Sequence, residues 1–149
     1  MLFRSKLPTY WGTSFSKICL GMMVHNQSNF VVIDTHASSL HSLIADGQYR
    51  AIPLGRDTWK NLLGSAASLQ RYCNREGFNA RCTWGRQVFS KVRIGILGNQ
   101  ENNCLSCDSR IGFGTGGKPD DSNTCGNVAA HSPDNGERSI KAMGYILVQ

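Results

Sequence analysis

The residues best suited to chemistry lie between Gly98 and Glu137, a segment that holds six of the chain's ten acidic residues. Its stretch NNCLSCDSRIGFGTGG, residues 102–117, combines a CxxC pair with a glycine cluster. Hard cations such as Ca²⁺ bind about six to eight oxygens from carboxylates, amides and backbone carbonyls, often in irregular loops. The segments GNQENN, CDS, PDDSN and PDNGE supply such groups. Without a fixed ligand spacing, a calcium loop and a solvated polar loop remain equally good interpretations.

Cysteine chemistry offers two alternatives to calcium. Cys104, Cys107, Cys125 and His131 form the pattern C-x2-C-x17-C-x5-H, whose ligand types resemble a structural zinc set. The spacing is loose, and the surroundings are rich in asparagine. A redox CxxC would begin a helix, whereas Leu105 and Ser106 lead into another polar stretch. Six cysteines in Gly-, Asn- and Ser-rich surroundings favour disulfides and an extracellular location instead.

Nucleotide binding and catalysis are poorly supported. GFGTGG, residues 112–117, matches the letters of a dinucleotide-binding turn, but the following KPDDSN has no helical periodicity to hold a pyrophosphate. No serine lies in a G-x-S-x-G pattern, and the four histidines are scattered: His25, His36, His41 and His131. We therefore expect the protein not to be an enzyme.

The elements that must position this segment are mainly strands. Apolar runs rich in β-branched residues predict strands over residues 18–24, 30–33, 88–97 and 140–148, the last being central. Apolar spacing predicts short helices over residues 38–47, with Ser38 as the cap, and 56–64. We expect a single α+β domain over residues 1–149: a twisted, mainly antiparallel sheet, two or three short helices and a long disulfide-stapled loop region rich in Gly and Asn.

The net charge of +6 does not by itself indicate nucleic acid. Residues 1–97 hold 12 basic and 4 acidic residues, but the arginines are spread singly, which favours a solvated face and no nucleic-acid partner. No run approaches the roughly 18 apolar residues of a membrane helix. The chain begins without the pattern of a secretory signal, so its cysteines predict an N-terminally truncated extracellular protein. Asn26, in NQS, is a glycosylation acceptor in that case.

Several segments resemble the C-terminal part of a fibrinogen-related, intelectin-like extracellular domain. This domain is abundant in cnidarian secreted modular proteins, including those of the coral skeletal organic matrix. The resemblance covers nearly the whole chain and is carried by KLPTYWGTSFSKICLGM, SLHSLIADGQYRAIPLGRDTWKNLLGSAASLQ, CNREGFNA, KVRIGILGNQENNC, DSRIGFGTGG, DDSNTCGN, PDNG and IKAMGYILVQ. Such domains open upstream with a GGGW-type segment, so the resemblance implies a truncation that exposes a sheet edge.

The resemblance also implies how the cysteines pair. Cys19, Cys73, Cys104 and Cys125 fall where the group has cysteine, Cys107 stands where relatives often have proline, and Cys82 lies in a variable stretch. The pairing it implies is two regular disulfides, Cys19 to Cys73 and Cys104 to Cys125, and an additional bridge, Cys82 to Cys107.

The function that the resemblance implies is a secreted, non-enzymatic, lectin-like module that binds calcium, and a glycan or matrix ligand beside it, through residues 98–137. The expected oxygen donors are Asn99, Glu101, Asn103, Asp108, Asp120 and Asp121. His131 and Tyr145 are expected to contact the ligand, although no histidine pair follows a CIGGGG-like segment as in intelectins. An ion pair with Arg110 is the alternative role for Asp108, and core packing is the alternative for Tyr145. The alternative function is a purely structural extracellular-matrix module without a specific small ligand.

Overall fold

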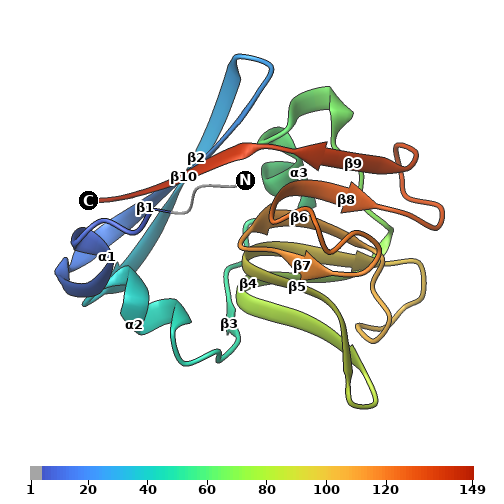
Figure 1. Ribbon diagram of the computed structural model, residues 1–149, viewed down its shortest axis with the longest axis horizontal. Helices are drawn as coiled ribbons and strands as arrows, with labels where there is room; N and C mark the ends of the chain where they lie inside the picture. The colour runs from blue at the N-terminus through green and yellow to red at the C-terminus, as the bar shows by residue number, and fades with distance from the viewer. Residues whose placement is uncertain (1–4) are drawn as a thin grey trace.

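The computed structural model describes residues 5–149, whose strands form two antiparallel sheets (Figure 1). The smaller sheet has the order β10-β1-β2, with β1 at Phe15–Val24, β2 at Gln27–Ala37 and β10 at Met143–Val148. The larger sheet has seven strands in the order β3-β4-β5-β6-β8-β9, with β7 paired to β5. Its strands are β3 Arg50–Ala51, β4 Tyr72–Trp84, β5 Gln87–Asn99, β6 Ser109–Phe113, β7 Gly116–Gly117, β8 Cys125–Ala129 and β9 Arg138–Lys141.

Four short helical segments accompany the sheets: α1 Thr9–Gly12, α2 Leu40–Ile44, α3 Arg56–Asn61 and the 3-10 helix η1 Gly64–Ala66. The α+β class and the mainly antiparallel pairing are confirmed, but the strands form two sheets where one was expected. Both predicted helices exist, although Ser39 caps α2 in place of Ser38 by accepting a hydrogen bond from the Ser42 N–H at 3.0 Å. Within residues 5–149, no helix has the length and apolar content needed to cross a lipid bilayer.

Both faces of the smaller sheet carry large apolar side chains. Alternation on β1 turns Ile18, Leu20 and Met22 into the core, where none of the three is exposed. The two residues of the β1–β2 turn, His25 and Asn26, have positive φ angles, which suit a tight hairpin. The opposite face of the sheet carries large apolar side chains that are 52 to 66% exposed: Phe30, Val32, Met143 and Leu147.

The last segment of the chain joins the two sheets. Residues 140–148, predicted as one central strand, divide at Ala142 into β9, at the edge of the larger sheet, and β10, at the edge of the smaller. The prediction of a central strand is therefore wrong, and β1 occupies that place. Figure 1 shows the red end of the chain running from one sheet to the other.

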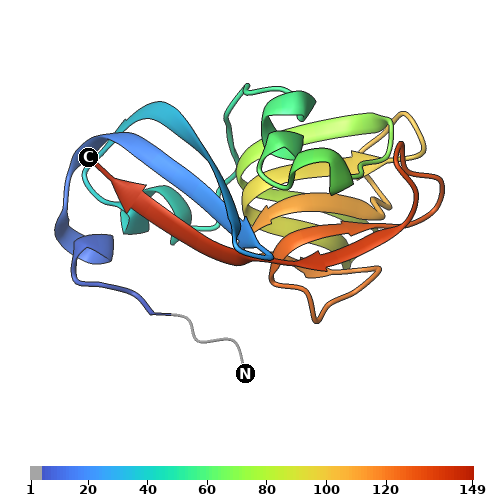
Figure 2. The ribbon, with the colours of Figure 1, turned by 90° about the horizontal axis from the view of Figure 1, so that it is seen from above.

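The main core joins the inner face of the smaller sheet to the face of the larger sheet that α3 covers (Figure 2). Trp59 of α3 is fully buried, and its indole N–H donates to the Glu76 carboxylate on β4 at 2.6 Å. Glu76 also accepts a hydrogen bond from the Gly55 N–H at the start of α3, so one side chain on β4 fixes both the position and the start of the helix.

Candidate functional site

Two disulfides attach the polar segment 99–108 to β4. They join Cys73 to Cys104 and Cys82 to Cys107, and the Sγ atoms of Cys73 and Cys82 lie 4.0 Å apart. The predicted bridge from Cys82 to Cys107 is confirmed. The other two predicted pairs are wrong because Cys73 and Cys104 are joined to each other.

The remaining two cysteines, Cys19 and Cys125, lie outside this cluster. Cys19 is on the middle strand of the smaller sheet, between Val32 and Leu147, and is not in a disulfide. Cys125 begins β8 and packs against the main core. The strand order therefore separates both from their expected partners.

The disulfides also remove the thiolates that a zinc site would need. In the part of the chain that the structure describes, one group of three His, Cys, Asp or Glu side chains has its ligand atoms within 4.8 Å of one another: Cys73, Cys82 and Cys107. All three are in disulfides. Cys104 and Cys107, two members of the sequence pattern that resembles a zinc set, are likewise oxidised.

Three of the expected calcium donors, Asn99, Glu101 and Asn103, form one hydrogen-bonded group at the end of β5. Asn99 is fully buried, and its amide donates to both the backbone oxygen and the side-chain oxygen of Asn103 at 3.0 Å. The Asn103 amide donates to Glu101 at 3.2 Å, and Asn103 Oδ1 also accepts from the Leu105 N–H. The asparagines therefore hold the loop in shape, whereas Glu101 is exposed to solvent.

Asp108 lies at the end of the same loop and has a different environment. Its backbone is held on both sides, because its N–H donates to Gln70 Oε1 at 3.1 Å and its carbonyl accepts from the Ala130 N–H at 3.0 Å. Its half-buried carboxylate accepts no hydrogen bond from any residue of the described chain. Burial raises the pKa of Asp108; His131 and Lys118 oppose this rise, and the nearby charge of Glu101 adds to it.

Arg110 organises the second half of the polar segment. Its side chain is fully buried, and its guanidinium donates to four backbone carbonyls: Gly117 at 3.1 Å, Lys118 at 2.8 Å, Asp120 at 2.5 Å and Asn123 at 3.0 Å. Burial lowers the pKa of Arg110 to about 10, so the group stays charged at neutral pH. Arg110 thus points away from Asp108, and the alternative of an ion pair between them is wrong.

The last two expected donors, Asp120 and Asp121, accept hydrogen bonds from groups of this second half and of β9. Asp120 accepts from the Ser122 hydroxyl at 2.6 Å and from the Ser139 hydroxyl at 2.9 Å, and these bonds lower its pKa to about 2. Asp121 accepts from the Gly117 N–H at 2.7 Å. The six expected donors therefore divide into a group of four, between Asn99 and Asp108, and this separate pair.

The residues expected to contact a ligand lie apart. His131 is exposed, with a φ of 54°, and its carbonyl accepts a hydrogen bond from Gln70 at 2.9 Å. Tyr145 lies on β10 in the other sheet, where its ring covers Gly21. Tyr145 thus packs on a sheet surface and not at the polar segment. Asn26 lies exposed in the β1–β2 turn, a position that a glycan can reach.

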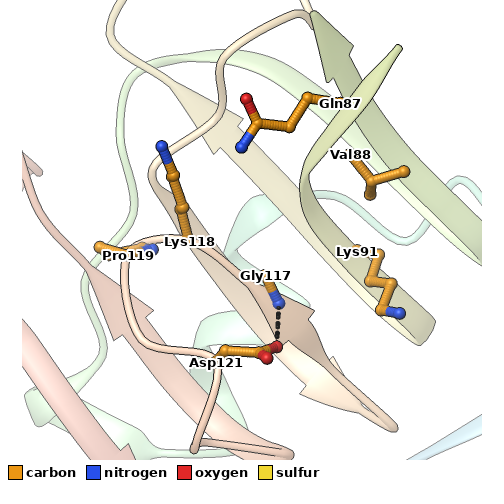
Figure 3. A pocket seen from close by; sticks show the side chains of 7 residues that line it. All are labelled: Gln87, Val88, Lys91, Gly117, Lys118, Pro119 and Asp121. Carbon is orange, nitrogen blue, oxygen red and sulfur yellow. Dashed lines mark hydrogen bonds between the residues drawn. The ribbon is translucent and has the colours of Figure 1, made fainter.

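The glycine cluster of the polar segment allows close backbone approach. Gly117 has a φ of 85°, and a Cβ there would collide with the Phe89 carbonyl on β5. No helix follows the cluster, which excludes the phosphate-binding arrangement of a dinucleotide fold. The approach instead places Lys118 and Asp121 beside β5, where a hollow of about 380 Å³ opens (Figure 3).

The sequence interpretation missed two features of this region. The inward turn of Arg110 has no local signal, because RIGF is indistinguishable from an exposed strand with one cation. The basic surface beside the hollow has a weak sequence signal, since residues 77–100 contain four basic residues and no Asp or Glu. Comparison of the chain with protein-family models, with curated proteins and with solved structures finds no match.

Proposed function

We propose that the chain is a secreted, non-enzymatic extracellular module, lectin-like and of the fibrinogen-related, intelectin-like kind. It binds calcium at the loop that runs from Asn99 to Asp108 and presents a glycan or matrix ligand site beside that loop. The two disulfides are compatible with this location, since such bonds persist in oxidising compartments.

The observation that carries the calcium proposal is the environment of Asp108. A carboxylate that is half-buried, receives no hydrogen bond within the described chain and has another acidic group nearby costs the apo protein stability. A divalent cation would add positive charge beside this carboxylate, beyond that of His131 and Lys118. Glu101 and Asp108 would provide the anionic oxygens, and the Asn99 and Asn103 amides would hold the loop around them.

The direction of the Asp108 pKa shift gives a sharp test. When folding raises the pKa of a carboxyl, the free energy of unfolding of the protein falls as pH rises from the unfolded pKa of that group to its folded pKa. Ionised Asp108 therefore destabilises the folded protein at pH 7. Asp108→Asn removes that charge without removing a hydrogen bond. Without calcium, we expect the variant to unfold at a higher temperature than the wild type.

Calcium should reverse that order. A ligand at 100 times its Kd stabilises the folded state by about 2.7 kcal/mol, so the wild type should gain a higher unfolding midpoint in calcium than in chelator. Asp108→Asn should show no such gain. Asp34→Asn on β2, an exposed carboxylate of the other sheet, is the matched control and should respond to calcium like the wild type.

The alternative is a structural matrix module that binds no specific small ligand. A folded wild type whose midpoint is the same in calcium and in chelator would remove the calcium proposal and favour this alternative. An equal calcium response in Asp108→Asn and the wild type would place the ion elsewhere.

A further inference from the structure

We propose that the β4–β5 hairpin and the adjoining loop 117–121 form a second ligand site, which binds the sulfate groups of an anionic glycan. The Cys82–Cys107 disulfide links this hairpin to the proposed calcium loop, Asn99 to Asp108, but the site shares none of the four candidate donors of that loop. It does not depend on calcium, and its failure is distinguishable from failure of the calcium proposal.

Strand pairing gathers cations that are dispersed in the sequence. Arg81 on β4 and Lys91 on β5 are direct partners, and partners across an antiparallel pair have side chains on the same face. Arg93 follows two positions along β5, where it bonds Asn79, and Arg86 lies in the turn of the hairpin. All four side chains are exposed, and residues 77–100 contain no acidic residue to neutralise them.

These cations are also free of ion pairs. The three ion pairs found within residues 5–149 use Arg50, Arg56 and Lys60. The basic hairpin therefore holds unneutralised charge, and a polyanion that releases its counterions on contact would bind there.

A hollow beside the hairpin offers a concave place for a ligand next to these cations. It is lined by Gln87, Val88, Lys91, Gly117, Lys118, Pro119 and Asp121, and Figure 3 shows Lys91 and Lys118 on either side of it. The Lys118 backbone N–H donates to the Phe89 carbonyl at 2.5 Å, and its ammonium lies 4.8 Å from the Phe89 ring centroid. Lys118 is thereby held at the rim. The Asp121 carboxylate accepts from the Gly117 N–H and is the one acidic group in the lining.

A sulfated sugar fits these groups better than nucleic acid. Arginine and lysine bind sulfate oxygens as they bind phosphate, through charge-assisted hydrogen bonds. Trp84, 57% exposed, is the strand partner of Gln87 and offers an aromatic face to a sugar ring. The two disulfides that anchor this hairpin belong to an oxidising compartment, where extracellular glycans are the available polyanions.

The test is binding of the full chain to a heparin-type sulfated glycan in chelator, titrated with salt. Replacing Arg81 and Lys91 by Gln should weaken binding about tenfold at 0.15 M salt and lower the slope of log K against log salt by about 2. Lys118→Gln should lower the slope by about 1. Asp121→Asn should strengthen binding, because it removes the one carboxylate but keeps an oxygen for the Gly117 N–H.

Lys17→Gln on β1 is the matched control, since it removes an exposed charge from the other sheet and should leave the affinity within about twofold. An equal loss in Lys17→Gln and in Lys118→Gln would overturn the proposal in favour of non-localised charge. Equal binding of the desulfated glycan would exclude sulfate recognition. Tighter binding of a single-stranded oligonucleotide of matched charge would overturn the choice of glycan.

Discussion

Replacement of Arg110 by Met should destabilise the fold strongly although no ion pair is lost. The four carbonyls that bond the guanidinium belong to residues between Gly117 and Asn123, and three of these hydrogen bonds are 2.8 to 3.1 Å long. A hydrogen bond to a charged group contributes about 1.5–3 kcal/mol, and a buried acceptor left without a partner costs about 1–3 kcal/mol. Removal of the buried cation offsets part of this loss, since its burial was itself unfavourable.

We therefore expect Arg110→Met to lower the free energy of unfolding by about 3 kcal/mol, and Arg110→Lys by somewhat less, because a lysine cannot reach all four carbonyls. The assay is denaturant unfolding with the disulfides intact, combined with hydrogen exchange of the amides in residues 114–124. Arg71→Met, which removes an exposed cation stacked on Tyr72, is the control and should cost less than about 1 kcal/mol. A loss below about 1 kcal/mol in Arg110→Met, with unchanged exchange in that segment, would refute the central role of the guanidinium.

Two further predictions concern stability. On β2, Ile33→Ala should lower the free energy of unfolding by about 2–4 kcal/mol because Ile33 is only 4% exposed. Phe30→Ala should lower it by less than about 1 kcal/mol because Phe30 is 66% exposed. Thermal unfolding of the two variants tests this contrast, and equal losses would contradict it. Burial alone would raise the pKa of Asp134, but hydrogen bonds from Lys60, the Leu69 N–H and Arg56, together with the charge of Lys60, lower it. Ionised Asp134 therefore stabilises the folded protein above the ordinary carboxyl pKa, and this stabilisation is lost as pH falls through the folded pKa of Asp134. Asp134→Asn should lower stability at pH 7 by about 1 kcal/mol, after allowance for solvent screening, and should reduce the further loss below about pH 4; an unchanged acid profile would contradict this assignment.

The elements with regular apolar periodicity were predictable from the sequence. The middle of β5 alternates Val92, Ile94 and Ile96 with other residues, and the α3 segment buries Trp59 and its C-cap residue Leu62, so both elements were found. The β4 strand was missed because YCNREGFNARCTW has no such alternation. Its place is fixed by pairing with β5 and by two disulfides, neither of which leaves a periodic signal.

The partners of side chains were less predictable than the elements. The family resemblance implied the Cys82 to Cys107 bridge correctly, but it joined Cys73 to Cys19. Sequence position does not reveal which sheet a strand joins, so nothing in the sequence corrected this pairing. The same limit applies to charge. Arg81 and Lys91 are ten positions apart along the chain, and only the register of the hairpin makes them neighbours.

The polar segment between Gly98 and Glu137 thus uses two different sources of order. Its second half surrounds the buried guanidinium of Arg110. This group donates hydrogen bonds to the carbonyls of Gly117, Lys118, Asp120 and Asn123, the kind of oxygens that a metal ion would bind. Its first half has no internal cation, and there the Asp108 carboxylate is left without a hydrogen bond in the described chain. The proposed divalent ion fits the first half better than the second, because a second positive centre beside Arg110 would meet repulsion and carbonyls that are already bonded. The proposed calcium site is accordingly confined to the loop between Asn99 and Asp108, and the abundance of acidic residues further along the chain is not evidence for it.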